Sequence, residues 1–137
     1  MAAYVVDPSV ALSWVLPDET NELAAALRVA IEAGAEAWIP GHWWLEVGNG
    51  LWMAERRGRI AAEQVAHGLM LLQALPLAGD DATAEQVPGR IFVLARKHGL
   101  TIYDAAYLEL AQRRGAALAT FDDQLLKAAK KEKVPTA

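Results

Sequence analysis

Short apolar runs of β type alternate along this chain with longer segments in which apolar residues recur at helical spacing. The clearest strand candidates are Tyr4-Val5-Val6, Ala37-Trp38-Ile39 and residues 116–121. Strands that alternate with helices form a parallel sheet covered by helices on both faces. The order of the elements therefore predicts an α/β fold.

The helical segments are bounded by glycine and proline, the residues that most often terminate helices. Further short strands are expected at residues 75–77 and near Val134, which gives a sheet of four to five strands. The expected helices cover residues 9–16, 19–33, 42–57, 61–74, a stretch within 82–98 that begins near Pro88 or a few residues before it, 101–114 and 122–131.

The chain has 137 residues, of which 54% are hydrophobic, and it contains no cysteine. This length suits a single domain, residues 1–137, with a core of its own. The lack of cysteine excludes disulfides, thiolate metal sites and a cysteine nucleophile, and it suits a reducing cytoplasm. There is no signal peptide at the start and no apolar run of about 18 residues that could span a membrane. We therefore expect a cytoplasmic protein without a membrane segment.

The net charge is −4, from 17 acidic residues against 13 Lys and Arg. This balance disfavours a nucleic-acid partner, because phosphate binding needs basic surface. The objection weakens if four acids bind metal, since the remaining acids and bases are then equal in number and bound cations reverse the local field. Basic residues cluster at residues 56–59 and 127–133, whereas the three histidines are isolated and are interpreted as structural: His42, His67 and His98.

Four acidic residues fall where the carboxyl ends of parallel strands would form a functional crevice. Asp7 directly follows the first strand, and Asp122 follows the strand at residues 116–121. Asp104 lies in the first turn of its helix, and Glu46 lies in an apolar run where an unpartnered charge is costly. The candidate catalytic residues are therefore Asp7, Glu46, Asp104 and Asp122.

Each acid also has a purely structural interpretation. Asp7 before Pro8 is a favourable N-cap with proline at the first helical position. Residues 101–104 and 120–123 both resemble capping boxes, and Glu46 could face solvent between core residues. Capping alone does not explain why three acids fall at one end of the expected sheet.

If the four carboxylates converge, their mutual repulsion must be offset. Two unit charges about 4 Å apart repel by about 4 kcal/mol at an effective dielectric constant near 20, a cost that a bound cation removes. Oxygen ligands without His or Cys indicate a hard ion, Mg²⁺ or Mn²⁺. Such ions activate water and stabilise the leaving oxygen of a phosphodiester, so the pattern predicts a metal-dependent phosphodiesterase.

Three neutral side chains are candidates to support this site. Ser9 could bind a metal-bound water or a phosphate oxygen, and Thr120 could orient Asp122. Asn49 lies on the same helical face as Glu46. Helix capping is the alternative for both Ser9 and Thr120.

Two other kinds of protein are consistent with parts of this pattern. A phosphatase with Asp7 as nucleophile would need a second acid two residues later, where this chain has Ser9, and an active-site lysine, whereas no lysine precedes Lys97. A non-catalytic interaction module would not need all four acids. Both alternatives are weaker than a metal-dependent nuclease.

Four motifs occur together in the order and spacing of a known family. Residues 6–10 (VDPSV) resemble its opening D-x-S, and residues 45–51 (LEVGNGL) resemble its E-V-x-N-x-L. Residues 99–111 resemble its longest signature, and residues 118–122 (LATFD) resemble its L-x-T-x-D. The chain thus resembles the PIN domain family and, within it, the VapC-type toxins of bacterial and archaeal toxin–antitoxin pairs.

This resemblance implies a PIN-like three-layer sandwich with a mainly parallel sheet, and Mg²⁺- or Mn²⁺-dependent endonucleolytic cleavage of RNA. It implies a homodimer silenced by a cognate antitoxin whose tail enters the acidic groove. It also implies that the metal-binding and catalytic set is Asp7, Glu46, Asp104 and Asp122. Asp123 departs from the family pattern, which often has a basic or neutral residue there. It is either a fifth ligand or a cap of the last helix, and we expect the cap.

Overall fold

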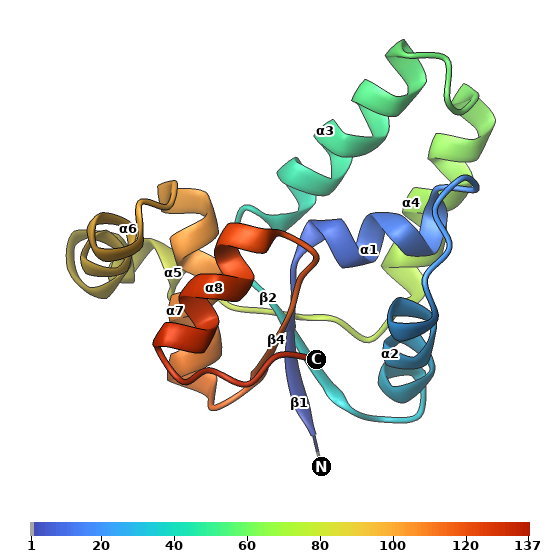
Figure 1. The fold of residues 1–137 in the computed structure, drawn as a ribbon. Helices are drawn as coiled ribbons and strands as arrows, with labels where there is room; N and C mark the ends of the chain where they lie inside the picture. Colours follow the sequence, from blue (N-terminus) through green and yellow to red (C-terminus); the bar gives the residue numbers. More distant parts are fainter. Residues whose placement is uncertain (1) are drawn as a thin grey trace.

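The computed structural model describes residues 2–137 and has a parallel four-stranded sheet at its centre (Figure 1). The strands are β1 (Ala3–Val6), β2 (Glu36–Ile39), β3 (Ala78–Gly79) and β4 (Ala117–Ala119), in the order β3-β2-β1-β4. Tyr4 of the central strand pairs with Ala37 on one side and with Ala117 on the other. A parallel bridge between Leu118 and Thr136 extends the β4 edge, close to the strand expected near Val134. The predicted parallel α/β sheet is confirmed.

The strand expected at residues 75–77 lies further along the chain than predicted. Ala78 and Gly79 of β3 pair with Trp38 and Ile39 of β2. Pro76 has no backbone N–H and cannot donate to a strand ladder, so pairing begins only after it. The predicted position of this strand is therefore wrong.

Helices cover both faces of the sheet and give the predicted three layers (Figure 1). One side carries α1 (Pro8–Val15), α2 (Glu22–Glu32), α3 (Trp43–Arg56) and α4 (Ala62–Ala74). The other carries α5 (Thr83–Gln86), the π-helical turn η1 (Val87–Ile91), α6 (Phe92–His98), α7 (Ile102–Arg114) and α8 (Asp123–Lys131). α3 and α4 form a hairpin that projects beyond the carboxyl ends of the strands. Within residues 2–137, none of these helices has the length and apolarity needed to cross a membrane.

Two helices begin at residues other than those expected. α2 starts at Glu22 rather than at residue 19, because the Asn21 side chain caps it by accepting a 3.0 Å hydrogen bond from the Ala24 N–H. The helical region within residues 82–98 starts at Thr83, so Pro88 lies inside it. Gly89 has non-helical dihedral angles (φ −121°, ψ −111°) and kinks the chain before α6.

α7 packs against β1, and the start of α3 is fixed against the end of that strand. α7 is buried without interruption from Ala105 to Ala111, and Tyr107 within it is fully buried. The indole N–H of Trp43, also fully buried, donates a 2.8 Å hydrogen bond to the carbonyl of Val6. Both helices therefore present their first turns at the carboxyl edge of the sheet.

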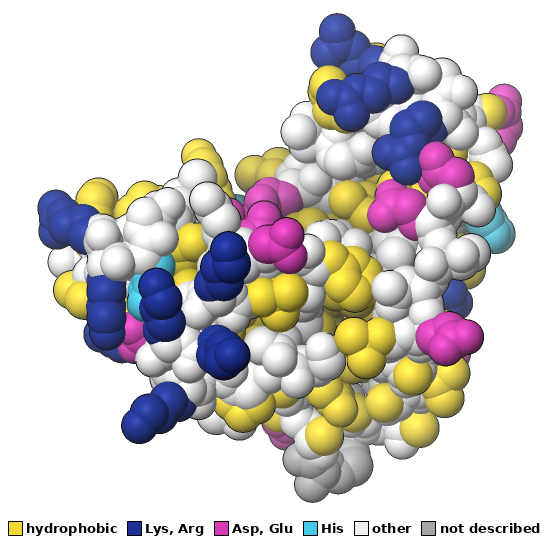
Figure 2. Space-filling model, viewed as in Figure 1, with side chains coloured by type: hydrophobic (Ala, Val, Ile, Leu, Met, Phe, Trp, Pro, Cys, Tyr) yellow, Lys and Arg dark blue, Asp and Glu magenta, His cyan; other side chains and the backbone are white. Residues whose placement is uncertain are grey.

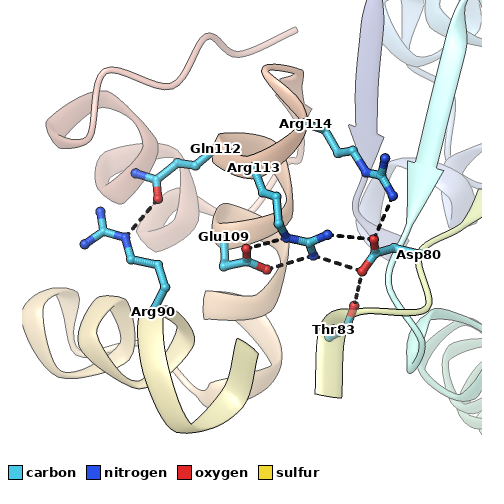
Figure 3. Close-up of polar contacts among 7 residues, drawn as sticks. All are labelled: Asp80, Thr83, Arg90, Glu109, Gln112, Arg113 and Arg114. Carbon is cyan, nitrogen blue, oxygen red and sulfur yellow. Dashed lines mark hydrogen bonds and ion pairs between the residues drawn. The ribbon is translucent and has the colours of Figure 1, made fainter. Parts of the chain in front are cut away.

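A buried ionic network holds the far end of α7 (Figure 3). Asp80 and Glu109 are only 4% and 3% exposed, and a buried charge needs a partner. Arg113 donates hydrogen bonds of 2.8 and 2.9 Å to Asp80 and of 2.7 and 3.0 Å to Glu109. Arg114 and Thr83 each donate a further hydrogen bond to Asp80, and this set of donors, with Arg113 foremost, holds the pKa of Asp80 well below its usual range. Nothing in the sequence pattern predicted this network.

Candidate active site at the carboxyl edge of the sheet

Asp7 lies at the end of β1 and is the most strongly fixed of the four candidate acids. It is the N-cap of α1, as expected, and its Oδ2 atom accepts hydrogen bonds from the Ser9 N–H (3.1 Å), the Ser9 hydroxyl and the Thr120 hydroxyl (3.1 Å). Burial raises the pKa of Asp7, and the hydrogen bonds from Ser9 and Thr120 only partly offset that rise. One carboxylate oxygen of Asp7 is thus held by three donors.

The second oxygen of Asp7 has a different environment. Oδ1 accepts no hydrogen bond from residues 2–137. Because no buried side-chain polar atom in this part of the chain lacks a partner, Oδ1 reaches the molecular surface. It is therefore available to a ligand at the carboxyl edge.

Ser9 and Thr120 join the ends of β1 and β4. The Ser9 Oγ atom accepts a 3.0 Å hydrogen bond from the Phe121 N–H, and the Thr120 Oγ1 atom accepts one of 3.1 Å from the Asp122 N–H. Each hydroxyl also donates to Asp7. Thr120 therefore contacts both the backbone of Asp122 and the carboxylate of Asp7, and the Ser9 hydroxyl contacts the same carboxylate.

Asp122 rather than Asp123 caps the last helix. Its carboxylate accepts a 2.8 Å hydrogen bond from the Leu125 N–H, whereas Asp123 is the first residue of α8 and is exposed. The prediction that Asp123 is the cap is wrong, because the chain enters α8 one residue earlier than a cap at Asp123 requires. The capping box expected at residues 120–123 is likewise absent, since Thr120 is directed towards Asp7.

Glu46 lies one turn into α3 and is half-buried, so it does not simply face solvent. Its Oε1 atom accepts a 2.7 Å hydrogen bond from the Tyr107 hydroxyl and lies 3.1 Å from His42 Nε2. Burial acts to raise the pKa of Glu46, but His42 and Tyr107 together outweigh it and the pKa is lowered. Glu46 is therefore ionised at neutral pH.

Asp104 lies in the first turn of α7, and its environment connects all four acids. Its backbone N–H donates a 3.0 Å hydrogen bond to the Thr101 hydroxyl, which confirms Thr101 as the N-cap. Burial, followed by the negative charges of Asp122, Asp7 and Glu46, raises the pKa of Asp104 to about 6. The four carboxylates therefore share one electrostatic environment.

The donor set fits a hard divalent cation. The side-chain ligands available are carboxylate oxygens, and the repulsion registered at Asp104 is the cost that a cation would relieve. Within residues 2–137, no group of three or more His, Cys, Asp or Glu side chains is arranged so that it could hold a metal ion, so the ligand set stays a prediction. Asn49 is exposed and makes no side-chain hydrogen bond to the four acids in the described chain, so its supporting role stays a prediction.

Two residues of this edge were missed by the sequence analysis. His42 is not isolated: it lies against Glu46, and its ring contacts Tyr103 and Tyr107 with centroid separations of 5.6 and 5.2 Å. The spacing of four residues between His42 and Glu46 was the available signal, because such residues are neighbours on a helix. Tyr107 and Glu46 are 61 residues apart in the sequence, so no local spacing could have predicted their contact.

Acidic side chains gather in the hollow between α8 and the base of α3, and basic side chains flank it (Figure 2). Lys and Arg lie over α8 on one side and at the tip of the α3–α4 hairpin on the other. Arg59 at that tip is engaged by Asp18 (2.8 Å) and Glu19 (3.2 Å), whereas Arg56 lies over the Trp52 ring. The charge pattern suits a polyanion that spans an acidic centre.

Comparisons with known proteins identify the family of the chain. The PIN domain family model matches residues 4–131. The chain is 35% identical over 121 residues to Ribonuclease VapC3 of Pyrobaculum aerophilum, a match that covers 88% of this chain and 90% of that protein.

Solved structures show the same architecture. PAE2754 from Pyrobaculum aerophilum superposes with a TM-score of 0.68 at 29% identity, over 93% of this chain and 79% of that one. VapBC2 from Rickettsia felis, solved bound to a DNA fragment from their promoter, has a TM-score of 0.69 at 15% identity, over 98% and 97% of the two chains. The chain therefore belongs to the PIN domain family.

Proposed function

We propose that this chain is a divalent-metal-dependent endoribonuclease that acts in the cytoplasm as the toxin of a toxin–antitoxin pair, with residues 1–137 as a single nuclease domain. The observation that carries the proposal is the placement of acids from separate segments at one edge of the sheet, where the Thr120 hydroxyl joins Asp7 to the backbone of Asp122. Burial, followed by the charges of Asp122, Asp7 and Glu46, raises the pKa of Asp104 to about 6. The similarity to Ribonuclease VapC3 supports RNA as the substrate.

Asp7, Glu46, Asp104 and Asp122 would hold Mg²⁺ or Mn²⁺ through their carboxylate oxygens. When bound, such an ion supplies Lewis-acid activation of water and neutralises charge at the scissile phosphate. The protein contributes orientation: Ser9 and Thr120 fix one oxygen of Asp7, and the Leu125 N–H fixes one oxygen of Asp122. These bonds leave the other oxygen of each acid for the ion.

The overall reaction is hydrolysis of a phosphodiester. A water oxygen bonds to phosphorus, one P–O ester bond breaks, and the departing oxygen takes up a proton. The acidic centre alone would repel RNA, so binding depends on the cation and on the flanking Lys and Arg residues. Cleavage should therefore require both metal and low to moderate salt.

The proposal is tested by RNA cleavage with and without Mn²⁺, comparing wild type with Asp7→Asn and Asp104→Asn. Asp81→Asn is a matched control, because Asp81 is an exposed acid outside the site. We expect metal-dependent cleavage by wild type and by the control, and a loss of at least a hundredfold in the two site variants. Metal-independent cleavage, or full activity of Asp104→Asn, would contradict the mechanism. Asp123→Asn in the same assay decides whether Asp123 is a fifth ligand.

The proposed partners are a cognate antitoxin and a second copy of this chain. The α3–α4 hairpin exposes large apolar side chains, including Leu45 (78%), Trp52 (51%) and Met70 (67%), and exposed apolar surface of this kind is typical of protein interfaces. Light scattering coupled to size-exclusion chromatography measures the dimer. Inhibition by the antitoxin is measured as the fraction of RNA that stays uncleaved when the antitoxin is added to the cleavage assay.

A further inference from the structure

We propose that His42 is a positioning residue, which fixes the Glu46 carboxylate and couples α3 to the start of α7. The inference rests on the proposed function, because it concerns how one of the proposed metal ligands is held. His42 itself would not touch the metal or the RNA.

The contacts of His42 determine which ring nitrogen carries the proton. Nε2 lies 3.2 Å from the carbonyl oxygen of Tyr103 and 3.1 Å from Glu46 Oε1. A carbonyl oxygen and an ionised carboxylate can only accept hydrogen bonds, so Nε2 must be the donor. The Nε2–H group therefore donates to the Tyr103 carbonyl while it lies against Glu46 Oε1, and it is not available to bind a metal.

The two acceptors belong to different helices, each of which carries a candidate ligand. Glu46 lies on α3, and Tyr103 directly precedes Asp104 on α7. The His42 ring, with its side chain 18% exposed, packs against the rings of Tyr103 and Tyr107. His42 therefore sets the spacing between the segments that carry Glu46 and Asp104.

The hydrogen bonds on Glu46 are asymmetric, which is the feature expected of an oriented ligand. Oε1 accepts a hydrogen bond from the Tyr107 hydroxyl (2.7 Å) and lies 3.1 Å from His42 Nε2, whereas Oε2 receives no hydrogen bond from residues 2–137. A glutamate side chain has several rotatable bonds, and fixing them in one conformation costs entropy. Because these contacts already fix the Glu46 side chain, that cost does not weaken the binding of an ion. Partners of this kind typically change metal affinity or activity by 10–100-fold when they are removed.

His42 at this position could also act only by packing, so the test must separate its N–H group from its ring. His42→Gln places an amide N–H near the position of Nε2 but lacks the ring. His42→Phe keeps a ring between Tyr103 and Tyr107 but cannot donate. His67→Gln is the matched control, because His67 is exposed on α4.

The readout is the dissociation constant for Mn²⁺, measured without RNA from the electron paramagnetic resonance signal of unbound Mn²⁺. We expect His42→Phe to weaken binding by 10–100-fold, His42→Gln to restore most of it, and His67→Gln to match wild type. In a Glu46→Gln background, His42→Phe should cause no further loss, since its effect passes through Glu46. Circular dichroism confirms folding, and if His42→Phe does not fold, His42→Asn, whose shorter amide cannot reach Glu46, replaces it.

Several results would overturn the role of His42. These are wild-type Mn²⁺ affinity in His42→Phe, failure of His42→Gln to restore binding, or an undiminished effect in the Glu46→Gln background. By contrast, absence of Mn²⁺ binding by the wild type would contradict the proposed function itself, and the two failures are therefore distinguishable.

Discussion

The hydroxyl of Thr120 donates a 3.1 Å hydrogen bond to Oδ2 of Asp7, across a separation of 113 residues in the sequence. The same hydroxyl oxygen accepts the N–H of Asp122 at 3.1 Å. One buried side chain thus links an acid at the end of the first strand to an acid at the end of the last. The position of Asp7 relative to Asp122 is therefore fixed by the pairing of β1 with β4 and by this side chain.

Thr120→Val keeps the shape of the side chain but removes both hydrogen bonds. It leaves the buried Asp7 short of a donor, and the free energy of unfolding should fall by about 1–3 kcal/mol. RNA cleavage should fall by more than tenfold, because Asp7 loses its orientation. Thr120→Ser keeps the hydroxyl and should retain most of both properties, and Thr20→Val, at an exposed position, controls for the substitution. Equal behaviour of the Val and Ser variants would exclude an orienting role for the hydroxyl.

Asp104 should make the metal-free protein less stable as pH rises. Its pKa is raised from 3.8 to about 6 in the folded chain, so between these values the folded state holds more protons than the unfolded state. The free energy of unfolding therefore decreases from about pH 4 to about pH 6, by about 1 kcal/mol once solvent screening is allowed for. Asp104→Asn should lack this decrease and be more stable than wild type at pH 7 in a chelator.

Urea denaturation from pH 4.5 to 7.5 measures this effect, with Asp81→Asn as the control. The same titration predicts weaker Mn²⁺ binding below pH 6, where a proton competes for Asp104. Identical pH profiles for wild type and Asp104→Asn would show that the acids do not interact in the folded chain.

Arg113→Met should unfold the protein far more readily than a surface arginine substitution. It leaves Asp80 and Glu109, both nearly fully buried, without their main cationic partner. Breaking a buried ion pair in this way typically costs about 3–5 kcal/mol. Guanidinium denaturation measures the loss, and Arg56→Met, at the exposed tip of α3, should change stability by less than about 0.5 kcal/mol. A small effect at Arg113 would mean that Arg114 alone is sufficient for Asp80.

Glu132, at the end of α8, should make the free energy of unfolding decrease in acid. Lys97 and then His98 lower its pKa to about 2. A carboxyl whose pKa is depressed on folding stabilises the protein above its unfolded pKa, and this stabilisation is lost as pH falls from about 4.5 to about 2. Glu132→Gln should be less stable at pH 7 and show a flatter stability profile below pH 4.5, whereas the exposed Glu63→Gln should follow wild type. Thermal unfolding at stepped pH distinguishes them.

Much of the fold was predictable because it depends on local periodicity. The alternation of apolar runs and helical segments predicted a parallel sheet, and Asp7 before Pro8 predicted the cap of α1, both of which the structure confirms. The helical pattern placed Asp104 in the first turn of its helix and Glu46 about one turn into its own, as the structure has them. In each case the information lies within a few consecutive residues.

The errors concern contacts that only the folded chain creates. Whether Asp122 or Asp123 caps α8 depends on where β4 ends and the helix begins. The Thr120 hydroxyl donates a hydrogen bond to Asp7 and does not cap the helix. The contacts of His42 with Tyr103 and of Glu46 with Tyr107 depend on how α3 meets α7, which sequence spacing does not encode. The contact between His42 and Glu46 was signalled by their spacing of four residues, and the sequence analysis did not use that signal.

The placement of β1 between β2 and β4 has a consequence for synthesis. Because β1 pairs with β4, Asp7 cannot be joined to Thr120 and Asp122 until synthesis has passed β4. A nascent or prematurely terminated chain lacks the complete acidic edge. Under the proposed function, cleavage activity therefore depends on synthesis having passed β4, since Asp122 and the Thr120 link to Asp7 are missing before that point.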